Sequence, residues 1–192
     1  MKKTNKILMI SSIIGMSLGL EVGVANAATN MNASKYVESI ENLQTTFNNK
    51  NKGFILNKIE VKESRGKHKR PIYRLEGFNP NDNQKVNMKL NANKPSDIIK
   101  NKVRKVDKHN KKQDVGIDAN DIKENPAEAI NLAKKYSKEN NNPIRWTLKM
   151  CKVNNKEEPV YKVNFKNSKH SKKIVKLNAL NGNKISVRND NK

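Results

Sequence analysis

The chain has few aromatic residues and a single cysteine, and each shortage narrows what the protein can be. Cys151 has no partner for an intramolecular disulfide, so stability must come from a packed core. The aromatic content of 5% leaves few rings on which nucleic-acid bases could stack, which argues against a nucleic-acid partner. These two absences favour a protein with a packed core and a partner other than nucleic acid.

Catalytic signatures are also missing. The sequence contains no glycine-rich phosphate loop, nucleophile elbow or His-Glu-x-x-His motif. The three histidines, His68, His109 and His170, lie in lysine-rich segments, where a solvated surface position is the simpler interpretation. We therefore predict a non-enzymatic protein without a cofactor or a metal ion.

Long hydrophobic runs are scarce, and the one extended run lies at the N-terminus. It covers residues 7–20, about 14 residues, which is shorter than the ~18 needed for a membrane-spanning helix. Three lysines precede it and Ala25-Asn26-Ala27 follows, an order typical of a secretory signal peptide cleaved after Ala27. With no cysteine near that site, a lipid anchor is not expected. We predict an exported protein that does not span the membrane and is extracellular or associated with the cell wall.

Acidic residues are outnumbered, with 18 Asp and Glu against 40 Lys and Arg and a formal net charge of +22. Cleavage would remove three lysines and one glutamate, which leaves a charge of about +20 on the mature chain. Such a charge favours anionic partners. The candidate binding patch consists of clustered cations in the first hairpin, the segment near residue 100 and a late loop: Lys62, Arg65, Lys67, Lys69, Arg70, Lys100, Lys102, Arg104, Lys105, Lys169, Lys172 and Lys173. The alternative is an ordinary solvated surface.

The mature chain contains an internal repeat. The segment Pro71-Ile72-Tyr73-Arg74-Leu75 recurs 88 positions later as Pro159-Val160-Tyr161-Lys162-Val163. Lys89-Leu90-Asn91-Ala92 likewise recurs 87 positions later as Lys176-Leu177-Asn178-Ala179. Apolar and polar residues alternate in these segments, which predicts half-buried antiparallel strands.

Further strands and one helix complete each copy. Ile59 and Val61 mark a preceding strand in the first copy, and Trp146, Leu148 and Met150 mark its counterpart. The last strand, at 185–187, follows the turn Asn181-Gly182. The predicted apolar helix faces are Tyr36, Val37, Ile40, Leu43 and Phe47 in the first copy, and Ala129, Ile130, Ala133 and Tyr136 in the second.

The second helix also carries a start signal, because Asn125 can cap it, Pro126 suits its first position and Glu128 completes a capping box. We predict an α+β fold of two repeats, each with one helix packed on a small antiparallel sheet of three to four strands. The first repeat covers residues 33–106 and the second 119–188, with a basic linker at 107–118.

The second copy resembles a PepSY domain. The resemblance rests on its Ala129-Ile130-x-x-Ala133 helix, its Pro159-Val160-Tyr161-Lys162-Val163 strand and its Asn178-Ala179-x-x-Gly182-x-x-Ile185 ending. It implies a helix packed on a small antiparallel sheet, and a role in binding or restraining exported peptidases. The chain departs from the family pattern at Asn91 and Asn178, where an aspartate is common, and the first copy lacks the turn glycine.

Two functional hypotheses follow. The first, which the resemblance implies, is a non-catalytic regulator that binds extracellular or envelope peptidases. The second, from the charge, is a cationic cell-wall-associated protein that binds anionic wall polymers.

Overall fold

The computed structural model of the chain describes residues 31–65, 69–106, 115–138, 141–166 and 171–191. The first half contains a short 3-10 helix η1 (Ala33–Lys35), helix α1 (Ile40–Lys50) and strands β1 (Ile55–Glu63), β2 (Pro71–Asn79), β3 (Gln84–Asn91) and β4 (Lys94–Lys105). The second half contains η3 (Ala119–Asp121), α2 (Pro126–Ser137) and strands β5 (Pro143–Val153), β6 (Lys156–Lys166), β7 (Ser171–Asn178) and β8 (Lys184–Asn191). Within these residues, neither helix is long and apolar enough to cross a lipid bilayer.

All eight strands belong to one antiparallel sheet, in the order β4-β3-β2-β1-β5-β6-β7-β8. The prediction of two repeats with separate small sheets is therefore wrong. The two halves join where β1 pairs with β5, with Val61 opposite Trp146 and Lys58 opposite Lys149. Separate small sheets would leave the N–H and C=O groups on these edges of β1 and β5 without strand partners, and the join pairs them over residues 58–61 and 146–149. Side-chain alternation in a sequence shows which residues share a face, but not which strand edges meet.

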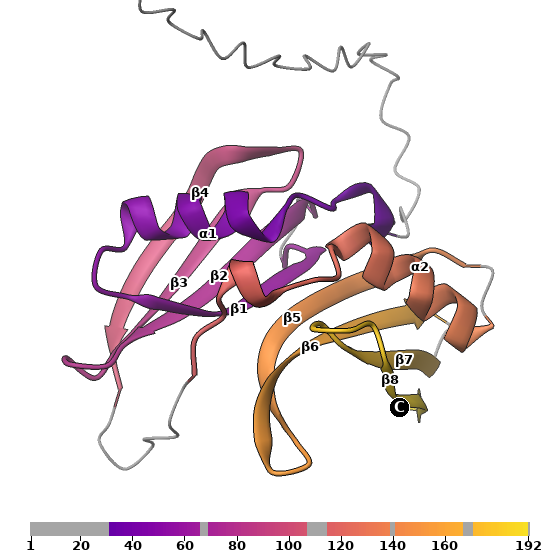
Figure 1. Cartoon of the computed structure of the whole chain (residues 1–192). Helices are drawn as coiled ribbons and strands as arrows, with labels where there is room; N and C mark the ends of the chain where they lie inside the picture. The colour runs from indigo at the N-terminus through magenta and orange to yellow at the C-terminus, as the bar shows by residue number, and fades with distance from the viewer. Residues whose placement is uncertain (1–30, 66–68, 107–114, 139–140, 167–170, 192) are drawn as a thin grey trace, which may run out of the picture.

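Both helices cover the same face of the sheet (Figure 1). The core between the helices and the sheet is continuous across the two halves. Trp146 occupies its centre, with Tyr73 and Tyr161 packed edge-on to the indole at ring centroid distances of 6.3 and 6.2 Å. The indole N–H donates a hydrogen bond of 2.9 Å to the carbonyl oxygen of Tyr36, so the segment before α1 is bound to a strand of the second half.

The predicted start of α2 is confirmed. The Asn125 side chain accepts a hydrogen bond from the Glu128 N–H at 2.9 Å, and the Glu128 carboxylate accepts one from the Asn125 N–H at 3.1 Å. Ala129, Ile130 and Ala133 are buried as predicted, but Tyr136 is 38% exposed. The Lys184 ammonium lies 5.3 Å from the centre of the Tyr136 ring. Ser137 is the buried residue at this end of the helix, because the apolar stripe drifts around the helix axis.

Helix α1 begins later than its apolar pattern predicts. The Ser39 hydroxyl accepts a hydrogen bond from the Asn42 N–H at 3.1 Å and caps the helix, so the chain turns helical only at Ile40. Tyr36 and Val37 therefore precede the helix, yet both still pack against the core.

Strand β4 was not predicted, because lysines interrupt its apolar residues. It forms one edge of the sheet, and an edge strand tolerates Pro95, which has no N–H to donate. At the C-terminus β8 extends to Asn191, beyond the predicted end of its strand.

Most of the predicted linker lies outside the described residues. Its last part is packed against the first half, since Ile117 is buried and its N–H donates to the Leu56 carbonyl oxygen at 2.7 Å.

Candidate polyanion-binding surface

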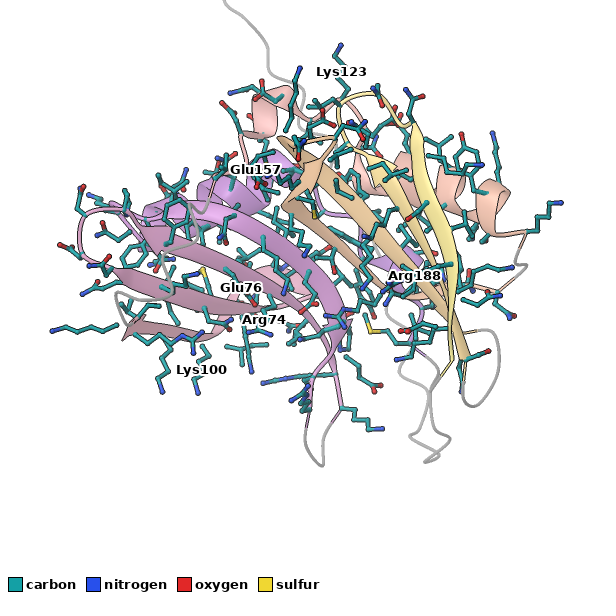
Figure 2. The ribbon with its side chains drawn as sticks, turned by 90° about the horizontal axis from the view of Figure 1, so that it is seen from below. Arg74, Glu76, Lys100, Lys123, Glu157 and Arg188 are labelled. Atoms are coloured by element: carbon teal, nitrogen blue, oxygen red, sulfur yellow. The ribbon has the colours of Figure 1, made fainter. Side chains whose placement is uncertain are left out.

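Side chains alternate between the two faces of every strand. The face opposite the helices, which we call the open face, is rich in basic residues and also carries a few apolar ones, such as Ile72 and Val160. On β1 the residues Ile59 and Val61 point toward the helices, whereas Lys58, Glu60 and Lys62 belong to the open face. Figure 2 views the molecule from below, with Arg74, Glu76 and Lys100 on one half of the sheet and Arg188 on the other. The open face therefore carries much of the positive charge of the described chain.

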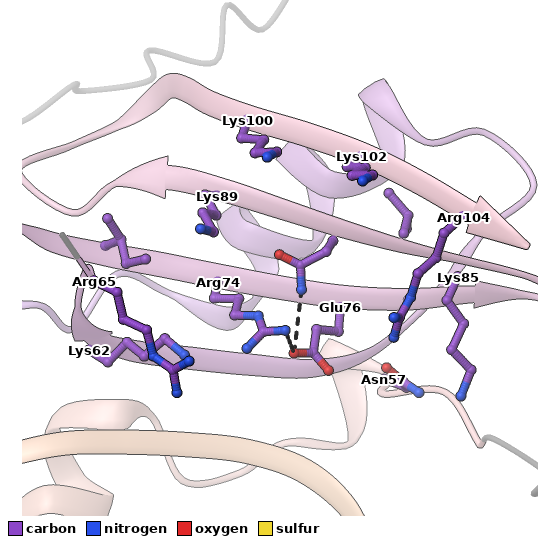
Figure 3. Close-up of a pocket in the computed structure, with 14 residues that line it drawn as sticks. Asn57, Lys62, Arg65, Arg74, Glu76, Lys85, Lys89, Lys100, Lys102 and Arg104 are labelled. Atoms are coloured by element: carbon purple, nitrogen blue, oxygen red, sulfur yellow. Dashed lines mark hydrogen bonds and ion pairs between the residues drawn. The ribbon is translucent and has the colours of Figure 1, made fainter. Parts of the chain in front are cut away.

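The open face of the first half contains a groove of about 410 Å³. Its lining is dominated by cations from β1 to β4 and the hairpin after β1: Lys62, Arg65, Arg74, Lys85, Lys89, Lys100, Lys102 and Arg104. Glu76 is the one carboxylate in the lining (Figure 3). It lies 2.8 Å from an Arg74 nitrogen and 3.2 Å from the Lys58 ammonium, so its charge is already paired. The groove therefore presents an excess of positive charge.

Strand pairing places these cations in register. Lys89 on β3 lies opposite Lys100 on β4, and Lys85 lies opposite Arg104. Like charges directly opposite each other on neighbouring strands destabilise a sheet, by up to about 1 kcal/mol a pair. An anion bound between the two strands would remove that cost. Successive side chains on one face of a strand, such as Lys100 and Lys102 on β4, are ~6.8 Å apart, so the cations also repeat along the strand.

A buried carboxylate lies where the two halves of the sheet meet. The Glu60 side chain is 0% exposed. Its carboxylate oxygens lie 2.7 Å from the Lys62 ammonium, 3.8 Å from that of Lys58 and 4.0 Å from an Arg74 nitrogen, and it also contacts the Arg145 guanidinium of β5. Together with Glu76, two carboxylates face four cations here. The cluster therefore keeps a formal charge of +2.

Crowding and partial burial disfavour the charged lysines of the open face. Burial, and then the positive charge of Arg74 and Arg65, lowers the pKa of Lys62. Burial also lowers the pKa of Lys162 on β6, and the neighbouring cations, led by Arg145 and Arg188, add to that effect. A bound polyanion would act in the opposite direction and restore the charged form.

The structure brings five of the predicted patch residues together in the groove: Lys62, Arg65, Lys100, Lys102 and Arg104. The others are dispersed. Lys69 lies 3.8 Å from Glu63, Arg70 is exposed just before β2, and Lys105 ends β4 opposite Gln84. Lys172 is on β7 opposite Asp190, and the Lys173 ammonium donates to the Ser137 carbonyl oxygen at the end of α2. Lys67 and Lys169 lie outside the described residues, as do His68, His109 and His170.

Sequence reasoning missed Arg74, Lys85 and Lys89 in the groove, and Glu60 and Arg145 beside it. The predicted patch was built from cations that lie close together in the sequence. These five residues are instead separated from one another by apolar residues in strands. A usable signal was present in the internal repeat. Arg74 has its counterpart in Lys162, and Lys89 has its counterpart in Lys176, so both copies place a cation at the same two strand positions.

The described residues offer little for other chemistry. They contain no group of three or more His, Cys, Asp or Glu side chains that could hold a metal ion. Cys151 is half-buried on β5 with a free thiol, beside a smaller pocket that Val160 and Ile185 also line.

The fold is similar to the crystal structure of a candidate lipoprotein from Clostridium difficile 630, with a TM-score of 0.66 and 21% sequence identity. The superposition covers 83% of this chain and 99% of that one. No family model matches the chain, and no curated protein matches it either. At this identity the likeness establishes a shared fold and says nothing about an activity or a partner. The PepSY resemblance stays a prediction.

Proposed function

We propose that this chain is an exported, non-catalytic protein whose open sheet face binds an anionic polymer of the cell envelope. The observation that carries the proposal is the groove, in which cations from four strands and a hairpin face one carboxylate that is already paired. Export rests on the basic and apolar N-terminal segment that ends at Ala27, and an exported protein meets wall polymers at high concentration.

The arrangement of the charge favours binding over a merely solvated surface. Lysines kept apart would serve solubility equally well, whereas Lys89 and Lys100 are held opposite each other on paired strands. Most of these cations stand on strands whose backbone is already ordered, so binding a ligand costs side-chain entropy but little backbone entropy.

The proposal is tested with the mature protein and purified anionic wall polymer at low and high salt. Binding should weaken steeply with salt, and the triple variant Lys100→Gln, Lys102→Gln, Arg104→Gln should bind at least tenfold more weakly at low salt. The control is a variant with the same loss of charge away from the open face: Lys50→Gln, Lys52→Gln, Lys135→Gln. Absence of binding by the wild-type protein would refute the function.

The peptidase-regulating hypothesis stays a prediction that rests on the PepSY resemblance. It is checked by adding the mature protein to exported proteases of the same cell. Inhibition or co-purification that survives the groove substitutions would favour it over polymer binding.

A further inference from the structure

The pairing registers of the sheet connect the groove to the second half of the chain. Successive pairings align one residue from each strand in a single line across the open face: Lys100, Lys89, Arg74, Glu60, Thr147, Lys162, Lys176 and Ser186. We call this line the transverse row. It crosses all eight strands, and at ~4.8 Å between neighbouring strands it spans about 34 Å.

The transverse row is basic on both sides of the join. Lys100, Lys89 and Arg74 occupy it in the first half, and Lys162 and Lys176 occupy it in the second. The internal repeat makes these positions equivalent, because Arg74 corresponds to Lys162 and Lys89 to Lys176. The β1–β5 join then aligns the two equivalent pairs in one line.

The middle of the row does not interrupt the positive charge. Glu60 is its one acidic residue, and its carboxylate is buried and surrounded by Lys58, Lys62 and Arg145. Lys58 on β1 also lies directly opposite Lys149 on β5, so two further lysines face each other across the join. A ligand that crosses the join at Glu60 and Thr147 therefore has cations beside it, although none lies on the row at those two positions.

We propose that a linear polyphosphodiester lies along the transverse row, across the strands, and contacts both halves of the sheet at once. This proposal rests on the proposed function. The observation is the alignment of five cations on both sides of the join, two pairs of which, Lys89 with Lys100 and Lys162 with Lys176, face each other without an intervening anion. The ligand has to be long, since no single phosphate reaches along about 34 Å.

The chemistry of the row fits a flexible phosphate chain better than a nucleic acid. Lysine ammonium groups act as mobile point charges and bind phosphates that are not held in one geometry. Neither the groove nor the transverse row contains an aromatic side chain on which a base could stack. The ligand class is therefore a base-free polyol phosphate, such as a glycerol-phosphate wall polymer freed of lipid.

The test measures binding of glycerol-phosphate polymer to the full mature chain by calorimetry across a salt series. The variant Lys162→Gln/Lys176→Gln removes two contacts outside the groove. We expect its affinity to fall about tenfold at low salt and its slope of log K against log salt to become shallower by about 1 to 2. The control Lys52→Gln/Lys135→Gln removes the same charge from exposed positions after α1 and on α2, and should bind like the wild type.

Two further measurements separate a contact from a change in folding. The variant Lys162→Arg/Lys176→Arg keeps both charges and should keep the affinity. Without ligand at low salt, Lys162→Gln/Lys176→Gln should melt at a higher temperature than the wild type, because a repelling pair is lost.

Oligomers shorter than the row should bind at least tenfold more weakly per molecule than polymer that spans it. Equal affinity for short and long ligands, together with an unaffected Lys162→Gln/Lys176→Gln variant, would overturn the transverse arrangement and leave binding in the groove intact. Failure of the wild type to bind any polymer would overturn the proposed function itself. Tighter binding of single-stranded DNA of equal charge would assign the row to nucleic acid and overturn the ligand class.

Discussion

Arg145 on β5 forms an ion pair with the buried carboxylate of Glu60 on β1, across the line where the two halves of the sheet meet. The pair joins segments that are far apart in the sequence, in a part of the sheet where Lys58 and Lys62 would otherwise repel Arg145. Glu60 is thus the counter-ion that allows several cations to share the centre of the open face.

Removing this counter-ion should destabilise the fold. Glu60→Gln preserves the side chain's shape but leaves Lys62 and Arg145 without their nearest negative charge. Because both cations keep some contact with solvent, we expect a loss of about 2 to 4 kcal/mol in the free energy of unfolding, measured by urea denaturation. Glu157→Gln, at an exposed position on β6, is the control and should change stability by less than about 0.5 kcal/mol. Equal stability of the two variants would contradict the role of Glu60.

Leu148 tests the core at the join. Its side chain is fully buried, and it lies opposite Ile59 of the other half. Leu148→Ala should lower the free energy of unfolding by about 2 to 5 kcal/mol, because it leaves a cavity between the sheet and the helices. Val103→Ala, on the exposed edge strand β4, should cost less than about 1 kcal/mol. A loss at Leu148 no larger than that at Val103 would show that the join is loosely packed.

The capping box of α2 makes a small and separable contribution. Asn125→Ala removes the acceptor for the Glu128 N–H and should cost about 1 kcal/mol in thermal or urea unfolding. Glu128→Ala removes the reciprocal hydrogen bond, and the double variant should cost less than the sum of the two single variants. Strict additivity would mean that the two hydrogen bonds act independently.

Gly77 on β2 is required by the close approach of α1. A Cβ atom at this position would lie 2.4 Å from the Phe47 ring and 2.7 Å from the Ile55 carbonyl oxygen. The ring can turn aside, but the backbone oxygen cannot, so Gly77→Ala should destabilise the protein by about 1 to 3 kcal/mol. The double variant Gly77→Ala/Phe47→Leu should recover only part of the lost free energy of unfolding, measured by urea denaturation. Full recovery would show that the backbone contact is unimportant.

Alkaline pH should unfold the protein through its buried tyrosines. Burial raises the pKa of Tyr73 from 10.0 to about 12, and burial also raises the pKa of Tyr161. A raised pKa stabilises the fold fully below pH 10, and this stabilisation is lost as the pH rises from about 10 toward 12. Phenolate absorbance from the buried Tyr73 should therefore appear only as the pH approaches 12, together with the loss of the folded structure. Ionisation of Tyr73 near pH 10 in the folded protein would contradict its burial.

Much of the local structure follows from short-range chemistry that the sequence displays. Asn125, Pro126 and Glu128 determine where α2 begins, because capping requires only neighbouring residues. Ile59, Val61 and Trp146 face the core, as the alternation predicts. The strand β4 was missed because an edge strand buries few apolar side chains, and its lysine-rich sequence carries no alternation signal.

The sequence by itself determined which strand positions carry cations, since Arg74, Lys89, Lys162 and Lys176 stand at equivalent places in the repeat. Only the tertiary structure decided that these positions form one line. That outcome depends on the antiparallel pairing of β1 with β5, in which Glu60 meets Thr147. Backbone hydrogen bonds make this join, and every residue except proline offers the same N–H and C=O groups, so the side-chain pattern does not reveal the partner strand or its register.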